Sequence, residues 1–223
     1  MTKQRKLRIL CFAFLWLLGI GLADASAFQL GPRSASERIE RLESPDRTAN
    51  LKIDEILARL KLKPGDVVAD IGAGTGTFSW PLARAVAPTG KLLAVEISQD
   101  LLDHINKRVK EEKVNNIQTV LGEFDDPKLP TRQVDMAFFH NVVHHIEHRA
   151  VYLKALAAYL KPTGRIVIID ADQEQPNAGH KDEPELQFSK AQLKQWMEDA
   201  GFVPVEQFPD LLDGKFFFIF ARR

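Results

Sequence analysis

Short apolar runs alternate with amphipathic stretches along most of this chain. The apolar runs have the length of buried strands, whereas Leu101, Leu102 and Ile105 recur at helical spacing after Ser98. Such alternation predicts a parallel sheet with helices on both faces. Strands are expected at residues 67–71, 91–97, 117–121, 134–139 and 165–170, with helices ending near residue 86 and spanning 98–113 and 150–160.

The two ends of this region have different patterns. Near the C-terminus, apolar runs at 203–208 and 215–221 flank a loop that ends in Asp-Gly, which predicts an antiparallel hairpin at one edge. The predicted fold class is therefore α/β, a doubly wound Rossmann-like sheet of seven strands, mostly parallel, with an antiparallel C-terminal edge hairpin. Further helices are expected around residues 34–42, over 48–60, and from Ser189 to Gly201, where Ser189 and Gln192 have capping-box spacing.

The N-terminus has the three parts of a secretory signal peptide. Basic residues such as Arg5 and Lys6 precede an apolar run from Ile9 to Ala23, and the sequence Ala-Asp-Ala-Ser-Ala ends at Ala27. The apolar run is shorter than the roughly 20 residues of a spanning helix. We expect cleavage after Ala27 or Ala25 and export to the periplasm or medium, with an uncleaved membrane anchor as the alternative.

The chain is therefore expected to divide into a signal peptide (1–27), an N-terminal extension or cap (28–50) and one domain (51–223). Its formal net charge is +0, so composition gives no sign of a nucleic-acid partner. The single cysteine, Cys11, lies in the apolar N-terminal run. No intramolecular disulfide and no cysteine metal site can therefore form in the folded part.

A glycine-rich loop follows the first strand of the domain. Gly72, Gly74 and Gly76 lie between this strand and the next helix, and Asp70 lies two residues before the first glycine. Glycines allow a sharp turn and close approach of a ligand, and ligands of open α/β sheets bind at the carboxyl ends of the strands. The loop therefore predicts a nucleotide-like ligand.

The details of the loop narrow the ligand class. Thr77 stands where a dinucleotide fingerprint needs its third glycine, and no Gly-Lys-Ser/Thr follows that would make a phosphate-binding P-loop. The Asp70 carboxylate would repel a pyrophosphate but suits a cationic amino group. Glu96 ends the second predicted strand, where an acid can accept hydrogen bonds from ribose hydroxyls.

These residues resemble the class I S-adenosylmethionine-dependent methyltransferases, especially the ubiquinone/menaquinone-biosynthesis-like group that acts on small molecules. The resemblance covers about residues 51–223. It implies that Asp70 holds the amino group of the methionine moiety and that Glu96 holds the ribose of S-adenosylmethionine. It also implies cofactor contacts from Gly72, Ala73, Gly74, Gly76, Ile97, Glu123, Phe124, His140 and Asn141.

The resemblance implies transfer of a methyl group to an acceptor, which is expected to be a small molecule. If that acceptor must lose a proton, His140, His144 and His180 are candidate general bases, because histidine titrates near neutral pH. His144 and His148 have the i, i+4 spacing of a helical metal pair. The family often has paired histidines at this place without a metal, so no metal is expected.

Two other functions compete with this hypothesis. A nicotinamide-dependent oxidoreductase would need the glycine that Thr77 replaces. An exported S-adenosylmethionine-binding or accessory protein could keep the fold without turnover, and the export signal favours this alternative because the methyl donor is made in the cytoplasm. Acceptor contacts are expected from residues 31–50 and 171–189. The sequence identifies neither the acceptor nor the oligomeric state.

Overall fold

A seven-stranded sheet forms the centre of the computed structural model, which describes residues 34–175 and 182–223. The strand order is β3-β2-β1-β4-β5-β7-β6. Neighbours from β3 to β5 are parallel, and β7 is antiparallel to both β5 and β6. The predicted fold class is thereby confirmed. The strands are β1 (Val67–Ile71), β2 (Lys91–Glu96), β3 (Ile117–Leu121), β4 (Val134–His140), β5 (Leu160–Ala171), β6 (Phe202–Gln207) and β7 (Lys215–Arg222).

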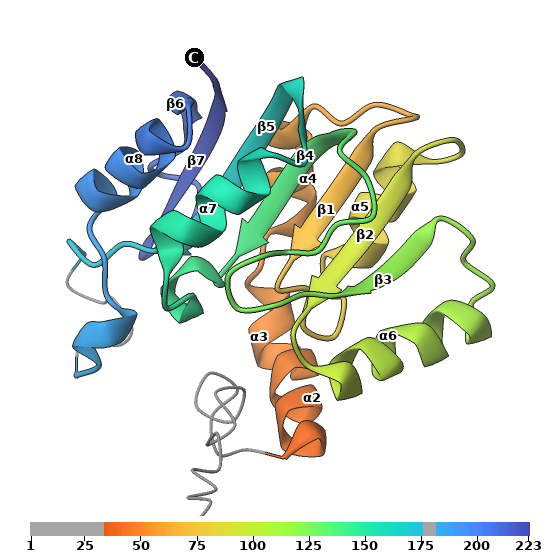
Figure 1. Ribbon diagram of the computed structural model, residues 1–223. Helices are drawn as coiled ribbons and strands as arrows, with labels where there is room; N and C mark the ends of the chain where they lie inside the picture. The colour runs from red at the N-terminus through yellow and green to blue at the C-terminus, as the bar shows by residue number, and fades with distance from the viewer. Residues whose placement is uncertain (1–33, 176–181) are drawn as a thin grey trace, which may run out of the picture.

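Helices cover both faces of this sheet (Figure 1). One face packs against α7 (Arg149–Ala157) and α8 (Lys190–Asp199), and the other against α4 (Ile53–Leu60), α5 (Ser79–Val86) and α6 (Gln99–Glu111). The expected capping box of Ser189 and Gln192 begins α8. The remaining helical segments are α2 (Ala35–Glu43), α3 (Pro45–Ala49) and the short 3-10 helices Val143–His145 and Pro184–Leu186.

The central strands are buried on both faces, as their near-continuous apolar runs require. In β4, Ala137 and Phe139 pack with the α7 and α8 side, whereas Met136 and Phe138 pack with the α4, α5 and α6 side. This alternation follows from the two-residue period of a strand. Because β1, β4 and β5 are parallel and fixed between two cores, their carboxyl ends meet at one rigid edge.

Two helix predictions are corrected by the structure. A single helix was expected over 48–60, but α3 ends at Ala49 and α4 begins at Ile53. The break contains Lys52 in the left-handed conformation, with φ +48°, and allows Leu51 as well as Ile56 to be buried. The helix expected over 150–160 ends at Ala157, because Leu160 already pairs with Val134 as the start of β5.

Strand β5 is accordingly longer than the expected 165–170. It starts at Leu160, and its register to β4 shifts between the Leu160–Val134 and Arg165–Met136 pairs. The intervening Lys-Pro-Thr-Gly segment forms an irregularity within the strand rather than a turn before it. Pro162 has no amide proton to donate, which explains why pairing is interrupted there.

No helix within residues 34–175 and 182–223 combines the length and apolarity needed to cross a membrane. The predicted signal segment and His180 lie outside these described residues.

Candidate functional site

The glycine loop lies at the carboxyl end of β1, at the edge of the sheet from which α3 and α2 extend (Figure 1). Gly72, Gly74 and Gly76 have φ values of +68°, +58° and +83°. A Cβ on Gly72 would lie 2.5 Å from a methyl carbon of Val142. The backbone therefore requires glycine for both conformation and space. Ala73 fixes the loop to β2, because its amide donates to the Val95 carbonyl at 2.9 Å.

Asp70 is a buried carboxylate directly before this loop, with 3% exposure. Its Oδ2 accepts a 2.6 Å hydrogen bond from the hydroxyl of Ser79 at the start of α5. Burial raises the pKa of Asp70 to about 7, the Ser79 hydrogen bond opposes this shift, and the nearby Glu96 charge adds to it. Within the described parts of the chain Asp70 has no ion-pair partner. Such a carboxylate favours a ligand that brings a cation.

Glu96, at the end of β2, faces the glycine loop from the neighbouring strand. Its two carboxylate oxygens accept hydrogen bonds from the backbone amides of Gly74 at 3.0 Å, Ile97 at 2.8 Å and Ser98 at 3.2 Å. Burial raises the pKa of Glu96, although these hydrogen bonds and the charge of Arg38 oppose the shift. A carboxylate has about four acceptor positions, so capacity remains for ligand hydroxyls.

Helix α2 covers the glycine loop and Glu96. The Leu42 Cδ1 atom lies 3.3 Å from the position that a Cβ on Gly74 would take. The Arg38 guanidinium donates to the Ser98 hydroxyl at 3.5 Å and brings a positive charge near Glu96. Ser98 occupies the expected N-cap position of α6, but its side chain makes no capping hydrogen bond. The extension thus reaches the site that the sequence predicts.

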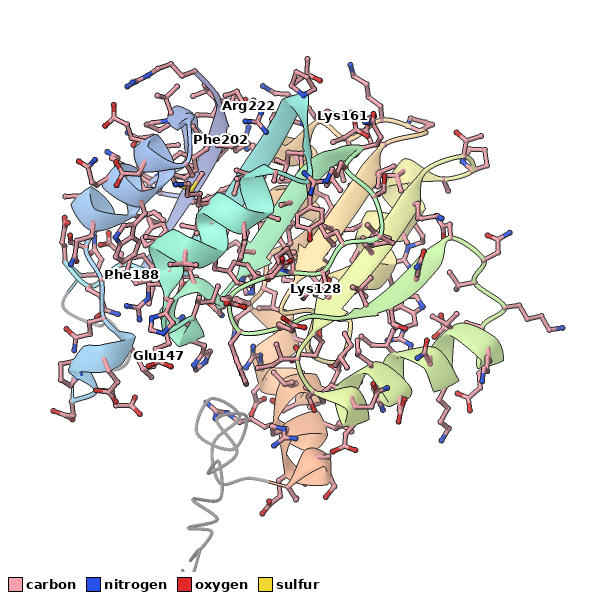
Figure 2. All side chains as sticks on the ribbon, in the orientation of Figure 1. Lys128, Glu147, Lys161, Phe188, Phe202 and Arg222 are labelled. Atoms are coloured by element: carbon pink, nitrogen blue, oxygen red, sulfur yellow. The ribbon has the colours of Figure 1, made fainter. Side chains whose placement is uncertain are left out.

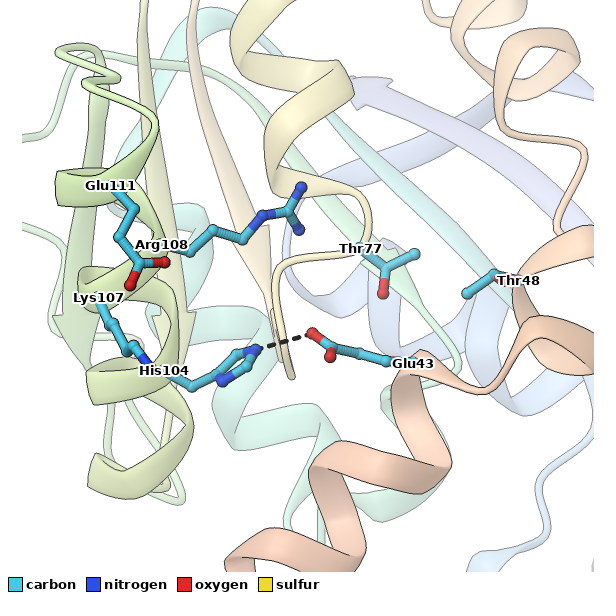
Figure 3. A pocket seen from close by; sticks show the side chains of 7 residues that line it. All are labelled: Glu43, Thr48, Thr77, His104, Lys107, Arg108 and Glu111. Carbon is cyan, nitrogen blue, oxygen red and sulfur yellow. Dashed lines mark hydrogen bonds and ion pairs between the residues drawn. The ribbon is translucent and has the colours of Figure 1, made fainter.

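A second contact joins α2 to α6 beside a cavity of about 400 Å³ (Figure 3). The His104 ring and the Glu43 carboxylate form a 2.8 Å hydrogen bond across this cavity. Thr77, which follows the last glycine of the glycine loop, lines this cavity. The cavity lies next to the loop but is not lined by Asp70 or Glu96, so it is distinct from the predicted cofactor contacts. Its full lining is Glu43, Thr48, Thr77, His104, Lys107, Arg108 and Glu111.

The residues predicted to contact adenine follow β3. Glu123 is exposed and forms a 3.0 Å ion pair with Lys128, which is labelled in Figure 2. Phe124 and Ile97 are half-buried. The structure therefore directs Glu123 toward Lys128, and a contact between Glu123 and adenine stays a prediction.

His140 ends β4 and Asn141 follows it, on the side of β1 away from β2. The His140 ring lies 4.6 Å from that of Phe78, and its Nε2 is buried without a hydrogen-bond partner among the described residues. Burial, together with the charges of Lys215 and Arg47, lowers the pKa of His140 to about 3. The imidazole is therefore neutral and only weakly basic at physiological pH. Because it would hold an abstracted proton poorly, it is a weak candidate for a general base.

His144, the second candidate base, is buried and paired with Asp170 at the end of β5. Its Nδ1 lies 2.6 Å from Asp170 Oδ1, and its backbone amide donates to Oδ2 at 3.2 Å. The pKa of Asp170 is lowered, because hydrogen bonds and the charge of His144 together outweigh the effect of burial. The pair holds the segment after β4 against β5. No group of three metal-binding side chains occurs within 34–175 and 182–223.

Sequence reasoning missed several charged residues that the fold brings to this edge. Arg38 and Arg47 come from the N-terminal extension, and Lys215 begins β7. Lys215 Nζ donates to Asn141 Oδ1 at 2.5 Å, 74 positions apart in sequence. No local pattern signals such contacts, because they depend on the packing of α2 and α3 and on the antiparallel pairing of β7.

The chain belongs to the methyltransferase domain family, which matches residues 62–201, more than half of its length. This match confirms the predicted cofactor, S-adenosylmethionine. The site fits that ligand, because the buried Asp70 carboxylate has no cationic partner among the described residues and the glycine loop can be approached closely.

Individual proteins support the same class. The chain is 28% identical over 120 residues to a demethylmenaquinone methyltransferase of Symbiobacterium thermophilum, a match covering 53% of this chain and 48% of the relative. It therefore spans about half the length of such curated relatives. Its fold is similar to that of an S-adenosylmethionine-dependent methyltransferase of Aquifex aeolicus, with a TM-score of 0.73, 24% identity, and coverage of 85% and 98% of the two chains.

A third similar structure is the magnesium protoporphyrin IX methyltransferase of Synechocystis with bound S-adenosylmethionine. Its TM-score is 0.60 at 18% identity, and the match covers 87% of this chain and 88% of that protein. These structural likenesses support the fold assignment.

Proposed function

We propose that this protein transfers a methyl group from S-adenosylmethionine to a small-molecule acceptor. The observation that carries the proposal is the buried Asp70 carboxylate, which has no cationic partner in the described residues and lies directly before the glycine loop. Glu96 lies on the adjacent strand, so the two acids flank the loop from β1 and β2. Together they suit a ligand with a cationic amino-acid end and a ribose.

Each residue of this set has a positioning role. S-adenosylmethionine, when bound, supplies a methyl group already activated on a positively charged sulfur. Asp70 binds the amino group, Glu96 accepts hydrogen bonds from the ribose, and the loop glycines leave room for the ligand. His140 and Phe78 exclude water beside the acceptor. Catalysis then rests on alignment of donor and acceptor.

We also propose that the protein is exported. The basic N-region, the apolar run from Ile9 to Ala23 and the small residues before Phe28 support this proposal. Mass spectrometry of the purified protein is expected to find an N-terminus at Phe28 or Ser26, and cell fractionation is expected to find it outside the cytoplasm. A protein that keeps Met1 and stays in the cytoplasmic fraction would contradict export.

Isothermal titration calorimetry tests the cofactor assignment directly. The full-length protein is expected to bind S-adenosylmethionine and S-adenosylhomocysteine with Kd values on the order of micromolar, because the buried acid and the loop suit both ligands. NAD is the matched control and is expected to show no binding, because Asp70 disfavours a pyrophosphate near the loop.

A transfer assay with a labelled methyl group then tests turnover. Label is expected in the small-molecule fraction of a bacterial extract. Binding of both sulfur ligands with label only in macromolecules would contradict the small-molecule acceptor. Binding of neither sulfur ligand would contradict the proposed function itself.

A further inference from the structure

Two cationic side chains from distant segments, Arg47 and Lys215, belong to elements at the carboxyl-end edge of the parallel strands. Lys215 is the first residue of β7 and pairs in register with Ala171, at the carboxyl end of β5. Arg47 belongs to α3, which extends from the same edge of the sheet. The 2.5 Å hydrogen bond from Lys215 Nζ to Asn141 Oδ1 fixes the ammonium directly after β4. The charges of both cations lower the pKa of His140, the last residue of that strand.

The surroundings of Lys215 and Arg47 disfavour the charged forms of both side chains. Lys215 and Arg47 are half-buried, and burial lowers the pKa of each. The charge of Arg47 lowers the pKa of Lys215 further. Among the described residues the Lys215 ammonium donates one hydrogen bond, to the neutral Asn141 amide oxygen. Two half-buried cations that repel each other favour a compensating negative charge.

The charge of Asp170 compensates Lys215 in part, but no described carboxylate forms an ion pair with either cation. The hydrogen bonds of Asp170 go elsewhere, because its Oδ1 accepts from His144 and Ala171, and its Oδ2 accepts from the His144 amide. In residues 34–175 and 182–223, neither Arg47 nor Lys215 forms an ion pair. A direct ionic partner for the two cations is therefore missing from the part of the chain that the structure describes.

We propose that Arg47 and Lys215 form an anion-binding subsite for a carboxylate group of the methyl acceptor. This inference rests on the proposed methyltransferase function and names its substrate class. The guanidinium of Arg47 can bind both oxygens of a carboxylate, and the Lys215 ammonium adds a point charge. The position at the ends of β4 and β5, beside His140 and Asn141, places the anion on the acceptor side of the site.

The carboxylate bound by Arg47 and Lys215 could come from a second source, the methionine moiety of the cofactor itself. The experiment therefore separates the acceptor carboxylate from the cofactor carboxylate. Calorimetry on full-length protein saturated with S-adenosylhomocysteine uses benzoate as the anionic probe and benzamide as its neutral counterpart, at constant ionic strength. Benzoate is expected to bind at least about tenfold more tightly than benzamide. Cofactor affinity is measured separately with S-adenosylhomocysteine and with 5′-methylthioadenosine, which lacks the carboxylate.

Arg47→Gln and Lys215→Met are each expected to raise the benzoate Kd about tenfold and to change the S-adenosylhomocysteine Kd less than about threefold. Arg84→Gln and Lys154→Met are matched controls, because both residues are exposed, and they are expected to leave the benzoate Kd unchanged. Circular dichroism checks that every variant is folded.

Three results would overturn the subsite. The first is equal binding of benzoate and benzamide, and the second is an equal effect of the control variants. The third is that the Arg47 and Lys215 variants bind S-adenosylhomocysteine more weakly, while their affinities for 5′-methylthioadenosine and benzoate are unchanged. The two cations would then hold the carboxylate of the cofactor. If the unmodified protein does not bind S-adenosylhomocysteine, the proposed function fails, and the same benzoate comparison on cofactor-free protein decides the subsite.

Discussion

Asp70→Asn is expected to raise the Kd for S-adenosylmethionine at least about 30-fold, because removing one member of a buried charge pair costs roughly 2–5 kcal/mol. The substitution keeps the size of the side chain and leaves an oxygen that can accept the 2.6 Å hydrogen bond from Ser79. It removes the negative charge that faces the cationic end of the ligand. Calorimetry at pH 8 measures the change.

The same substitution is expected to stabilise the ligand-free protein at pH 8. The folded pKa of Asp70 is raised from 3.8 to about 7, so the ionised form is disfavoured by folding. At about 1.4 kcal/mol per pKa unit, this corresponds to a penalty of about 4 kcal/mol above pH 7. The penalty develops as pH rises from the unfolded to the folded pKa. The gain from Asp70→Asn, measured by urea denaturation, is therefore expected to shrink toward pH 4.

The affinity of the unmodified protein for S-adenosylmethionine is expected to fall as pH decreases below 7, because the ligand needs ionised Asp70. Asp210→Asn is the control, since Asp210 is exposed in the loop between β6 and β7. A normal Kd for Asp70→Asn, or a loss of both affinity and stability at pH 8, would contradict the assigned role. The second result would mean that Asp70 serves the fold.

The elements that the sequence predicts well are those with strong local signals. Asp70, the loop glycines and Glu96 lie at the ends of predicted strands, and parallel topology brings the ends of adjacent strands together. The break at Lys52 and the early start of β5 lack such signals. Both features depend on tertiary packing, because Leu51 is buried at the break and Leu160 is buried where it pairs with Val134.

Charged side chains show the limit of sequence reasoning most clearly. Arg47 and Lys215 reach the site only because α3 extends from the sheet edge and β7 inserts antiparallel to β5. The motif predicts that Glu123 contacts adenine, which stays a prediction, but it gives no sign of the ion pair between Glu123 and Lys128. A motif fixes the position of the backbone, while the partner of an exposed charge depends on the neighbouring loops.

Asp170→Ala is expected to lower the free energy of unfolding at pH 7 by about 3–5 kcal/mol, because it leaves a buried polar network without its acceptor. Asp170 accepts from the His144 ring, the His144 amide and the Ala171 amide. Its pKa is lowered, so ionised Asp170 stabilises the fold above the unfolded pKa of 3.8, and this stability is lost as pH falls through the lower folded pKa. Urea denaturation at pH 7 and near pH 3 measures the effect.

Asp70 and Asp170 are thus expected to respond oppositely to pH although both are buried. Removing the charge of Asp70 stabilises the protein at high pH, whereas removing Asp170 destabilises it there. The difference arises because Asp70 has one hydroxyl donor and Asp170 has the His144 ring and two amides. The control for Asp170→Ala is a double-mutant cycle with His144→Ala. The double variant is expected to lose much less free energy of unfolding than the sum of the losses of the two single variants. Additive losses would show that the two side chains stabilise the fold independently, and the carboxylate would then owe its lowered pKa to the backbone amides alone.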